Sequence, residues 1–198
     1  MLEIKNVSYR YEEFWLLKNV NLVIRPGEVI GLFGPSGSGK TTLAKIAAGY
    51  LKPREGEVII DQRIQGTNRE KHPNPVQLIW QHPEKSMNPR WRMKEVLKEA
   101  GEPSSEILSV LEIKEEWLNR WPSELSGGEL QRFQLARALI STSQYLIADE
   151  MTAMLDAVSQ ANIWHAVLHL MKKHQIGMLA ISHDKRLLEM VSDRLICW

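Results

Sequence analysis

The chain has 198 residues, 43% of them hydrophobic, and a formal net charge of +1. This length suffices for one sizeable hydrophobic core, so we expect a single domain over 1–198. The near balance of charge gives no support to an extended nucleic-acid surface, although it leaves a local basic patch open, and no nucleic-acid partner is expected. No apolar run approaches the roughly 20 residues of a membrane span, no signal-peptide pattern is present, and the single cysteine, Cys197, rules out an intrachain disulfide. Any work at a membrane would need other chains to span it.

The first 33 residues predict strands. Apolar and polar residues alternate over 2–4, 7–11 and 20–24, which is typical of an antiparallel sheet with one solvated face. A Pro-Gly turn at 26–27 separates them from the apolar run 29–33, which predicts a buried strand.

Residues 34–41, Gly-Pro-Ser-Gly-Ser-Gly-Lys-Thr, fill every fixed position of the motif G-x-x-x-x-G-K-[ST]. The glycines let backbone N–H groups approach phosphate oxygens, aided by the N-terminal end of the helix that follows. Lys40 would reach the β and γ phosphates, and the Thr41 hydroxyl would ligate Mg²⁺. A glycine-rich turn could match by chance, but the preceding strand and following helix favour a nucleoside triphosphate site. The expected nucleotide-binding residues are Gly34, Pro35, Ser36, Gly37, Ser38, Gly39, Lys40, Thr41 and Thr42.

Beyond this loop, helices and strands alternate around a segment of different composition. We predict a helix over 41–51, strands over 57–61 and 75–80, and then helical stretches over 93–100 and 104–119. The Pro, Trp and charged residues of 83–121 indicate an inserted helical subdomain. The pattern ends with helix 130–140, strand 145–148, helix 161–171, strand 178–181 and helix 185–191.

This order predicts an α/β fold. Its core is that of a P-loop nucleoside triphosphatase with a mainly parallel sheet, because strands alternating with helices pair in parallel. An antiparallel β subdomain comes first, and a helical subdomain is inserted. The boundaries that we predict are 1–81 and about 135–198 for the core with its β subdomain, and about 82–134 for the helical subdomain.

A second anion-binding helix start is predicted at Leu-Ser-Gly-Gly-Glu, residues 125–129. A serine and two glycines there offer a hydroxyl, free N–H groups and the positive end of a helix dipole. One compact domain rarely directs two such helix ends at the same phosphate, so two chains facing each other are a sensible arrangement. An ordinary N-capped helix is the alternative.

Two acidic residues, Asp149 and Glu150, directly follow the apolar strand predicted over 145–148. A carboxylate at a strand's carboxyl end lies where open α/β sheets bind ligands. Neighbouring residues on an extended segment point in different directions, so metal binding and water activation can be divided between the two. Paired acids are also common at helix starts.

Together these motifs resemble the ATP-binding cassette (ABC) ATPases, the nucleotide-binding subunits of ABC transporters. The resemblance spans nearly the whole chain, with six motifs in the family's order. The family signature is LSGGQ, and Glu129 here replaces the glutamine while the serine and glycines are intact. The resemblance implies that Ser126, Gly127 and Gly128 contact the γ-phosphate held by the other subunit's phosphate loop.

The resemblance also assigns roles to the acids. Asp149 matches the Walker B aspartate that holds Mg²⁺, and Glu150 matches the glutamate that polarises the attacking water. Asp156, in Ala-Met-Leu-Asp, resembles the D-loop aspartate that contacts the opposite subunit. It could instead cap the helix from Val158 onward, and both roles can hold. Met151 stands where the family often has proline.

Further residues match the family around the nucleotide. His183 matches the switch histidine, which would bond the γ-phosphate and hold the catalytic glutamate and water. Gln81 matches the Q-loop glutamine, which senses Mg²⁺ and the γ-phosphate. Tyr11 lies as far before the phosphate loop as the aromatic that stacks on adenine, although Tyr9 and Trp15 are rivals, and all three could simply pack.

The segment Trp-Gln-His-Pro at 80–83, followed by Ser-Met-Asn-Pro-Arg at 86–90, resembles the peptide and nickel importer subfamily. This implies an ATPase with ATP and Mg²⁺ as cofactors and with Lys40, Glu150 and His183 as catalytic residues. It also implies permease subunits, a second identical or homologous ATPase subunit, an extracellular substrate-binding protein, and a peripheral position at the cytoplasmic face of the membrane.

Two other classes stay open. Soluble cassette proteins of DNA repair or translation share the ATP chemistry, but they usually carry a long coiled-coil insert or two cassettes in one chain. The second class is a nucleotide-binding module that has lost its ATPase activity, although the motifs here keep their reactive residues.

Overall fold

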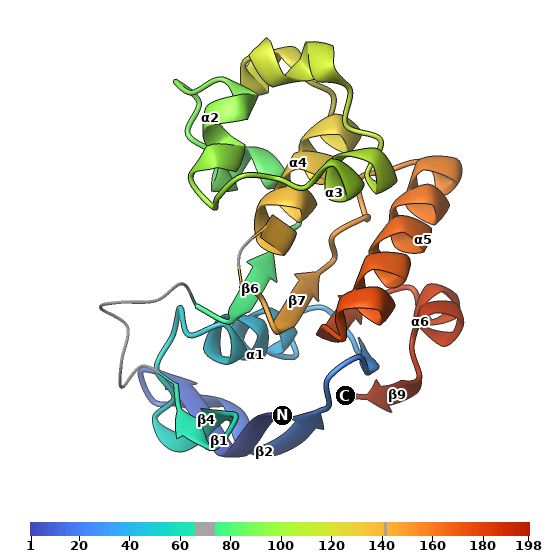
Figure 1. Cartoon of the computed structure of the whole chain (residues 1–198). Coiled ribbons are helices and arrows are strands. Elements are labelled where there is room, and N and C mark those ends of the chain that lie inside the picture. Colours follow the sequence, from blue (N-terminus) through green and yellow to red (C-terminus); the bar gives the residue numbers. More distant parts are fainter. Residues whose placement is uncertain (66–73, 141) are drawn as a thin grey trace.

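The computed structural model describes residues 1–65, 74–140 and 142–198. A four-stranded antiparallel sheet forms one end of the molecule (Figure 1). Its strand order is β2-β1-β4-β5. Its strands are β1 Leu2–Tyr11, β2 Phe14–Ile24, β4 Glu55–Ile60 and β5 Arg63–Ile64. The predicted strands 2–4 and 7–11 are one strand, in which the pairing register shifts between Ile4 and Val7.

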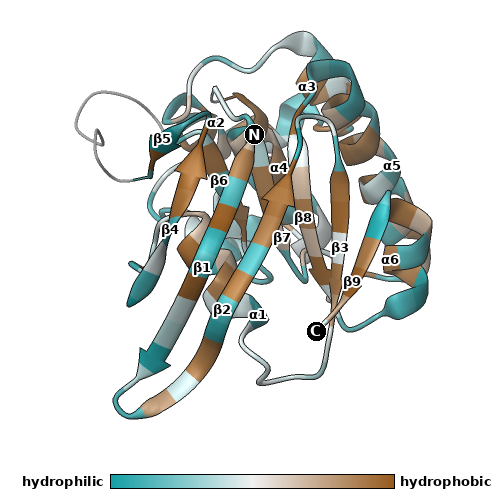
Figure 2. Cartoon of the chain, turned by 90° about the horizontal axis from the view of Figure 1, so that it is seen from below, coloured by the Kyte–Doolittle hydropathy of each residue, from teal (hydrophilic) through white to brown (hydrophobic). Residues whose placement is uncertain are grey.

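A second, five-stranded sheet has the order β6-β7-β8-β3-β9, and every neighbouring pair is parallel. The strands are β3 Val29–Phe33, β6 Val76–Ile79, β7 Tyr145–Asp149, β8 Gly177–Ser182 and β9 Arg194–Cys197. Hydrophobic residues dominate its central strands (Figure 2). The predicted parallel sheet is therefore confirmed, and with it the α/β fold class.

Helices cover both faces of the parallel sheet. One core cluster joins the antiparallel sheet, helix α1 (Lys40–Ala47) and one face of the parallel sheet, including Ile147 of β7. A second cluster joins the opposite face, including Leu146, to α4 (Gly127–Ile140), α5 (Ala157–His174) and α6 (Lys185–Val191). Consecutive residues of β7 thus enter different clusters, which explains its unbroken apolar sequence.

The region predicted as a helical subdomain lies at the end of the molecule opposite the antiparallel sheet (Figure 1). It holds α2 (Met93–Lys98) and α3 (Ser105–Val110), together with the 3₁₀ helices η1 (Pro83–Ser86), η2 (Glu115–Asn119) and η3 (Pro122–Glu124). The predicted helical stretch over 104–119 is therefore wrong as one element. Glu112 adopts a φ of +50°, and Ile113 N–H donates to the Leu108 carbonyl, a bond that ends α3 as in a Schellman motif.

The predicted helix over 41–51 is also too long. It ends at Ala47, because Gly49 takes a φ of +72° and Tyr50 N–H donates back to the Lys45 carbonyl. The predicted helix 185–191 has the observed bounds of α6. Within the described ranges, no helix combines the length and the apolar character needed to cross a membrane.

Candidate functional site

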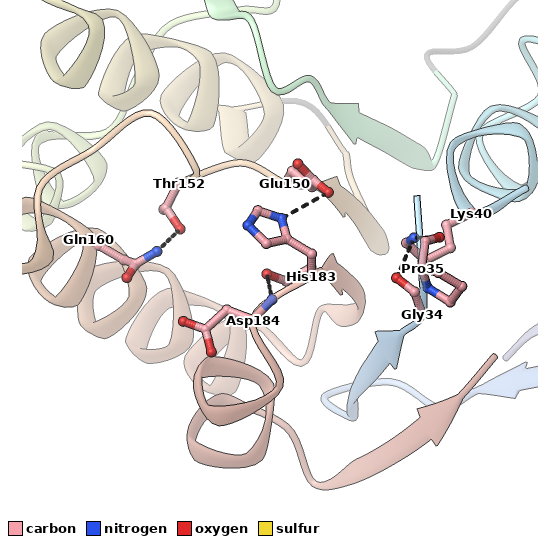
Figure 3. Close-up of polar contacts among 9 residues, drawn as sticks. Gly34, Pro35, Lys40, Glu150, Thr152, Gln160, His183 and Asp184 are labelled. Carbon is pink, nitrogen blue, oxygen red and sulfur yellow. Dashed lines mark hydrogen bonds and ion pairs between the residues drawn. The ribbon is translucent and has the colours of Figure 1, made fainter. Parts of the chain in front are cut away.

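The phosphate loop joins the carboxyl end of β3 to α1. Lys40, only 7% exposed, donates from Nζ to the carbonyl oxygens of Gly34 at 2.8 Å and Pro35 at 2.7 Å (Figure 3). Gly39 has a φ of +96°, and a Cβ atom there would lie 2.7 Å from the Leu17 side chain. Both the backbone conformation and the lack of space require glycine at this position.

A cavity of about 350 Å³ opens beside this loop. Most of the residues that line it were predicted as nucleotide or metal ligands, and they come from the loop, α1 and the ends of β6 and β7. The lining residues are Leu16, Ser36, Gly37, Gly39, Lys40, Thr41, Thr42, Gln81, Asp149 and Glu150. Leu16 was not predicted, because an apolar residue on β2 carries no motif. Gly34, Pro35 and Ser38 belong to the loop but are not among the lining residues.

Asp149 ends β7 and is 9% exposed. Burial raises the pKa of its carboxyl group, and the charge of Glu150 adds to the rise. A hydrogen bond from Thr41 and the charge of Lys40 act in the opposite direction. A buried carboxylate whose cationic neighbours do not offset its desolvation is suited to a bound cation.

The donor set in this cavity fits Mg²⁺. The Thr41 hydroxyl, the Asp149 carboxylate and the Gln81 side-chain amide all offer oxygen, the ligand that Mg²⁺ prefers. Among the described residues that line the cavity, none offers a sulfur or imidazole ligand that would favour a softer metal.

Glu150 marks a turn, not the end of an extended strand. Its φ is +51°, so the prediction that it continues the extended segment of Asp149 is wrong. Its N–H donates to the Ile181 carbonyl at 3.0 Å, which ties the turn to the neighbouring strand β8. The two carboxylates still contact different residues, Asp149 near Thr41 and Glu150 near His183. The left-handed turn at Glu150, not an extended strand, separates them.

This turn brings Glu150 to His183. The Nδ1 atom of His183, which follows β8, lies 3.2 Å from Oε1 of Glu150 (Figure 3). The imidazole is 64% exposed, whereas the glutamate side chain is 21% exposed. The two predicted catalytic side chains therefore meet, with Glu150 lining the phosphate-loop cavity and the more exposed His183 outside its lining.

The segment after Glu150 is tethered to α5 through Thr152, which sequence reasoning missed. Thr152 is 3% exposed, and its Oγ1 accepts a hydrogen bond from Gln160 Nε2 at 2.9 Å (Figure 3). The same oxygen accepts a hydrogen bond from Trp164 Nε1 at 3.1 Å. A second cavity of about 180 Å³ lies between this segment and residues 181–184. Nothing in the sequence pairs Thr152 with Trp164, because only the fold places them together.

The predicted signature residues lie elsewhere. Ser126 Oγ accepts from Glu129 N–H at 3.3 Å, and Glu129 Oε2 accepts from Ser126 N–H at 2.7 Å, which forms a capping box. Ser126 and Gly127 are exposed, and nothing described lies within 4 Å of a Cβ atom built on Gly127. Neither Ser126, Gly127 nor Gly128 is among the residues that line the phosphate-loop cavity. The N-capped helix is therefore present, and its start lies outside the cavity beside this chain's own loop.

Asp156 caps α5, as the alternative interpretation predicts. Its Oδ1 accepts from Val158 N–H and Ser159 N–H, each at 3.0 Å. A hydrogen bond from the Ser159 side chain is the largest cause that lowers the pKa of the exposed Asp156 carboxyl group, and the N–H bonds of Ser159 and Val158 add to the effect. Capping does not conflict with a contact to another subunit, because the side chain remains on the surface.

Tyr11 lies near the tip of the β1–β2 hairpin, 52% exposed, with its ring edge-on to Tyr9 at 5.0 Å. Tyr9 is buried in the core, which removes one rival for the adenine role. Trp15 packs under the Arg10 guanidinium at 5.2 Å. None of these aromatic side chains lines the phosphate-loop cavity.

The comparisons with known proteins agree with this geometry. A family model described as "ABC transporter" matches residues 17–153. The nickel import system ATP-binding protein NikE of Staphylococcus aureus strain bovine RF122 / ET3-1 is 35% identical, over 99% of this chain and 85% of that protein. NikE of strain MSSA476 is 34% identical with the same coverage.

Among solved structures, the dimeric structure of MJ0796, a bacterial ABC transporter cassette, is 29% identical. It has a TM-score of 0.85 and covers 100% of this chain and 94% of that one. A post-hydrolysis dimer of the same cassette, bound to ADP and Pi, has a TM-score of 0.84 and the same identity and coverage. The chain therefore belongs to the ABC transporter family and is one of its nucleotide-binding ATPases.

Proposed function

We propose that this chain is the ATP-hydrolysing subunit of a nickel importer and that it drives transport by closing with a second ATPase subunit around ATP. One observation carries the proposal. The cavity gathers Lys40, Asp149 and Glu150 within one chain, whereas the glycine-rich helix start at 126–128 lies outside it. A site divided in this way is complete only when another subunit supplies its own helix start.

The roles of the cavity residues follow from their chemistry. Lys40 would exchange the carbonyls of Gly34 and Pro35 for phosphate oxygens. Thr41, Asp149 and Gln81 would hold Mg²⁺, which supplies positive charge to the phosphates. The loop residues 34–39 and Thr42 would complete the nucleotide site.

Hydrolysis would begin with water on the cavity side of Glu150. The Glu150 carboxylate would orient and polarise that water for in-line attack on the γ-phosphate. His183, 3.2 Å from this carboxylate, would hold it in place and bond the γ-phosphate. The exposure of the imidazole leaves it free to reach a nucleotide held in the cavity.

The second subunit would complete the site. Its Ser126, Gly127 and Gly128 would present a hydroxyl, N–H groups and a helix dipole to the γ-phosphate. Asp156, exposed at the start of α5, would lie at the same contact between subunits. Tyr11 would stack on adenine, supported by its exposure at the hairpin tip.

The partners follow from the relatives. NikE is named as a component of a nickel import system, so we infer permease subunits that hold this chain at the cytoplasmic face of the membrane. An extracellular substrate-binding protein would deliver the cargo. Nickel is favoured over peptides because NikE relatives share 34–35% identity with this chain.

Replacing Glu150 by glutamine tests the catalytic assignment. Turnover of the reconstituted transporter should fall by about 1,000-fold, because general acid–base groups contribute roughly 10² to 10⁴ in rate. ATP affinity should be retained, and ATP should trap a dimer that light scattering detects. Glu189→Gln on exposed α6 is the matched control. Full turnover in the Glu150 variant would show that Glu150 is not the catalytic glutamate. Uptake of peptide but not of nickel by the intact transporter would show that the assignment of nickel as cargo is wrong.

A further inference from the structure

We propose that Trp198 is a positioning residue for the phosphate loop: its indole N–H holds the Ser38 carbonyl and thereby directs the Gly39 N–H at bound phosphate. The proposal rests on the proposed function of the loop as the nucleotide site. It concerns a residue that belongs to none of the motifs and is 160 positions from Ser38 in the chain.

The backbone brings Trp198 to the loop. Strand β9 runs parallel to β3 with Cys197 opposite Phe33, the last residue of β3. The next ladder bond joins Trp198 N–H to the Phe33 carbonyl at 2.7 Å. Trp198 therefore lies beside the point at which the loop leaves the sheet.

Trp198 contacts the loop at both its first residue and its fifth. A Cβ atom built on Gly34 would lie 2.9 Å from Trp198 Cβ and 3.5 Å from its carbonyl oxygen, so the two residues are in close contact. At the other end, Trp198 Nε1 donates to the Ser38 carbonyl oxygen at 2.8 Å. The indole thus bridges the loop from its exit to the residue before Gly39.

The hydrogen bond to Ser38 fixes the direction of a neighbouring donor. The peptide between Ser38 and Gly39 is trans and planar, so its carbonyl and its N–H point in opposite directions. With the carbonyl held by the indole, the Gly39 N–H points away from Trp198. Gly39 lines the nucleotide cavity and Trp198 does not, so this donor faces the side on which phosphate would bind.

No other side chain described holds this peptide. The Ser38 hydroxyl is buried without a hydrogen-bond partner among the described residues. Lys40 binds the loop only at Gly34 and Pro35, and these bonds are exchanged when its ammonium turns to phosphate. The indole bond does not compete with the ligand, so it can hold the loop in both states and lower the ordering cost of binding.

Replacing Trp198 by phenylalanine removes the N–H donor while keeping a ring. A single neutral hydrogen bond corresponds to a change of roughly two- to tenfold in an equilibrium constant, and we expect the Kd values of ATP and ADP both to rise about fivefold in the full-length chain. They should rise together because loop N–H groups contact the α and β phosphates. In the reconstituted transporter the KM for ATP should rise in parallel, with little change in kcat. This pattern is expected when a lost interaction had stabilised the bound ground state and the transition state equally.

Trp91 provides the matched control, because it has the same 37% exposure as Trp198 but lies in the helical region. Trp91→Phe should leave both Kd values at the wild-type level. If the Trp198 variant binds ATP and ADP as tightly as the Trp91 variant does, the proposal is wrong. A loss of affinity for ATP but not for ADP would also contradict the proposal, because only ATP carries the γ-phosphate and the effect would then lie at that group.

A measurement on the unaltered chain is independent of folding of the variant. The indole N–H of Trp198, assigned from NMR connectivities within the unaltered chain, should exchange with solvent more slowly than that of Trp91, both without nucleotide and with ADP. Exchange as fast as that of Trp91 would refute the bond. Lys40→Ala separates the two proposals. If this variant retains full nucleotide affinity, the proposed nucleotide site itself is wrong. If Lys40→Ala loses affinity but the Trp198 variant keeps the wild-type Kd values, only the inference about Trp198 is wrong.

Discussion

The phosphate loop and the signature segment are both glycine-rich starts of helices, yet they differ in what their glycines contact. Gly39 of the loop is buried with a φ of +96° and would clash with Leu17 if it carried a Cβ. Gly127 of the signature segment is exposed, has no positive φ, and has open space where a Cβ would lie. The first glycine is required by this chain's own packing, and the second is not.

This difference shows where each site is completed. The loop forms a cavity with α1 and the ends of β6 and β7. In the signature segment, the capping box of Ser126 and Glu129 pairs the N–H groups of these two residues, and the segment contributes nothing to that cavity. A requirement for glycine at 127 must therefore come from outside the described chain, as the proposed second subunit would supply.

Alanine at each of these glycines gives the sharpest contrast and the largest expected effects. Gly39→Ala should lower both thermal stability and ATP affinity, the latter by about 100-fold, because strain at such a φ costs roughly 1–3 kcal/mol and the cradle is distorted. Gly127→Ala should leave both unchanged in the isolated chain but lower ATP hydrolysis by the assembled transporter about 100-fold. Calorimetry, nucleotide titration and phosphate release measure the three quantities.

If the Gly127→Ala variant hydrolyses ATP normally in the assembled transporter, the signature segment has no partner close to it, and the proposed completion by a second subunit is wrong. The comparison between the two glycines also fails if this variant unfolds, because that would reveal an internal requirement. Gly37→Ala controls for the backbone alone: Gly37 has a φ of +81° but free space around a Cβ.

A smaller effect is expected at the tether behind the catalytic turn. Thr152→Val keeps the shape but leaves the N–H groups of Gln160 and Trp164 without their acceptor. The loss is about 2 kcal/mol, which corresponds to a fall in Tm of about 6 °C for a domain of this size. We expect turnover to fall about tenfold through looser placement of Glu150, with ATP affinity retained.

Thr152→Ser keeps the hydroxyl and should restore most of the rate. If the valine variant turns over at the wild-type rate despite its lower Tm, the tether stabilises the fold without positioning the glutamate.

The smallest effect has the opposite sign and comes from Asp149. Its folded-state pKa is raised above the ordinary 3.8 by burial, so ionisation at neutral pH destabilises the ligand-free fold. Asp149→Asn should therefore raise Tm by about 2 °C at pH 7 without nucleotide, while Mg²⁺-dependent hydrolysis is lost.

The sign of this effect also sets its pH dependence. As pH falls through the folded-state pKa, the carboxyl group becomes neutral and the cost disappears, so the advantage of asparagine should vanish on acidification to about pH 4. Scanning calorimetry of both proteins from pH 7 to that point measures it. A variant less stable than wild type at pH 7 would show that the carboxylate is already compensated.

Patterns with a strong local cause were predicted well from the sequence. Buried strands such as β7 and β8 read as apolar runs, and α6 was predicted to its observed bounds. The errors arose where chain reversals depend on single residues: Glu112 and Glu150 adopt positive φ values that no hydrophobic period encodes. The lining of the cavity by predicted residues follows from the motifs, whereas Leu16 enters it only through the packing of β2.

The sequence by itself determined the ligand class and the fold class, because the phosphate loop, the acids after β7 and the alternation of apolar runs are local patterns with one common physical solution. Only the tertiary structure decided that the signature segment lies outside the cavity, that Thr152 is held by Trp164, and that Trp198 bridges the phosphate loop. These relations depend on the order of strands in the sheet and on packing between elements, which no local pattern specifies.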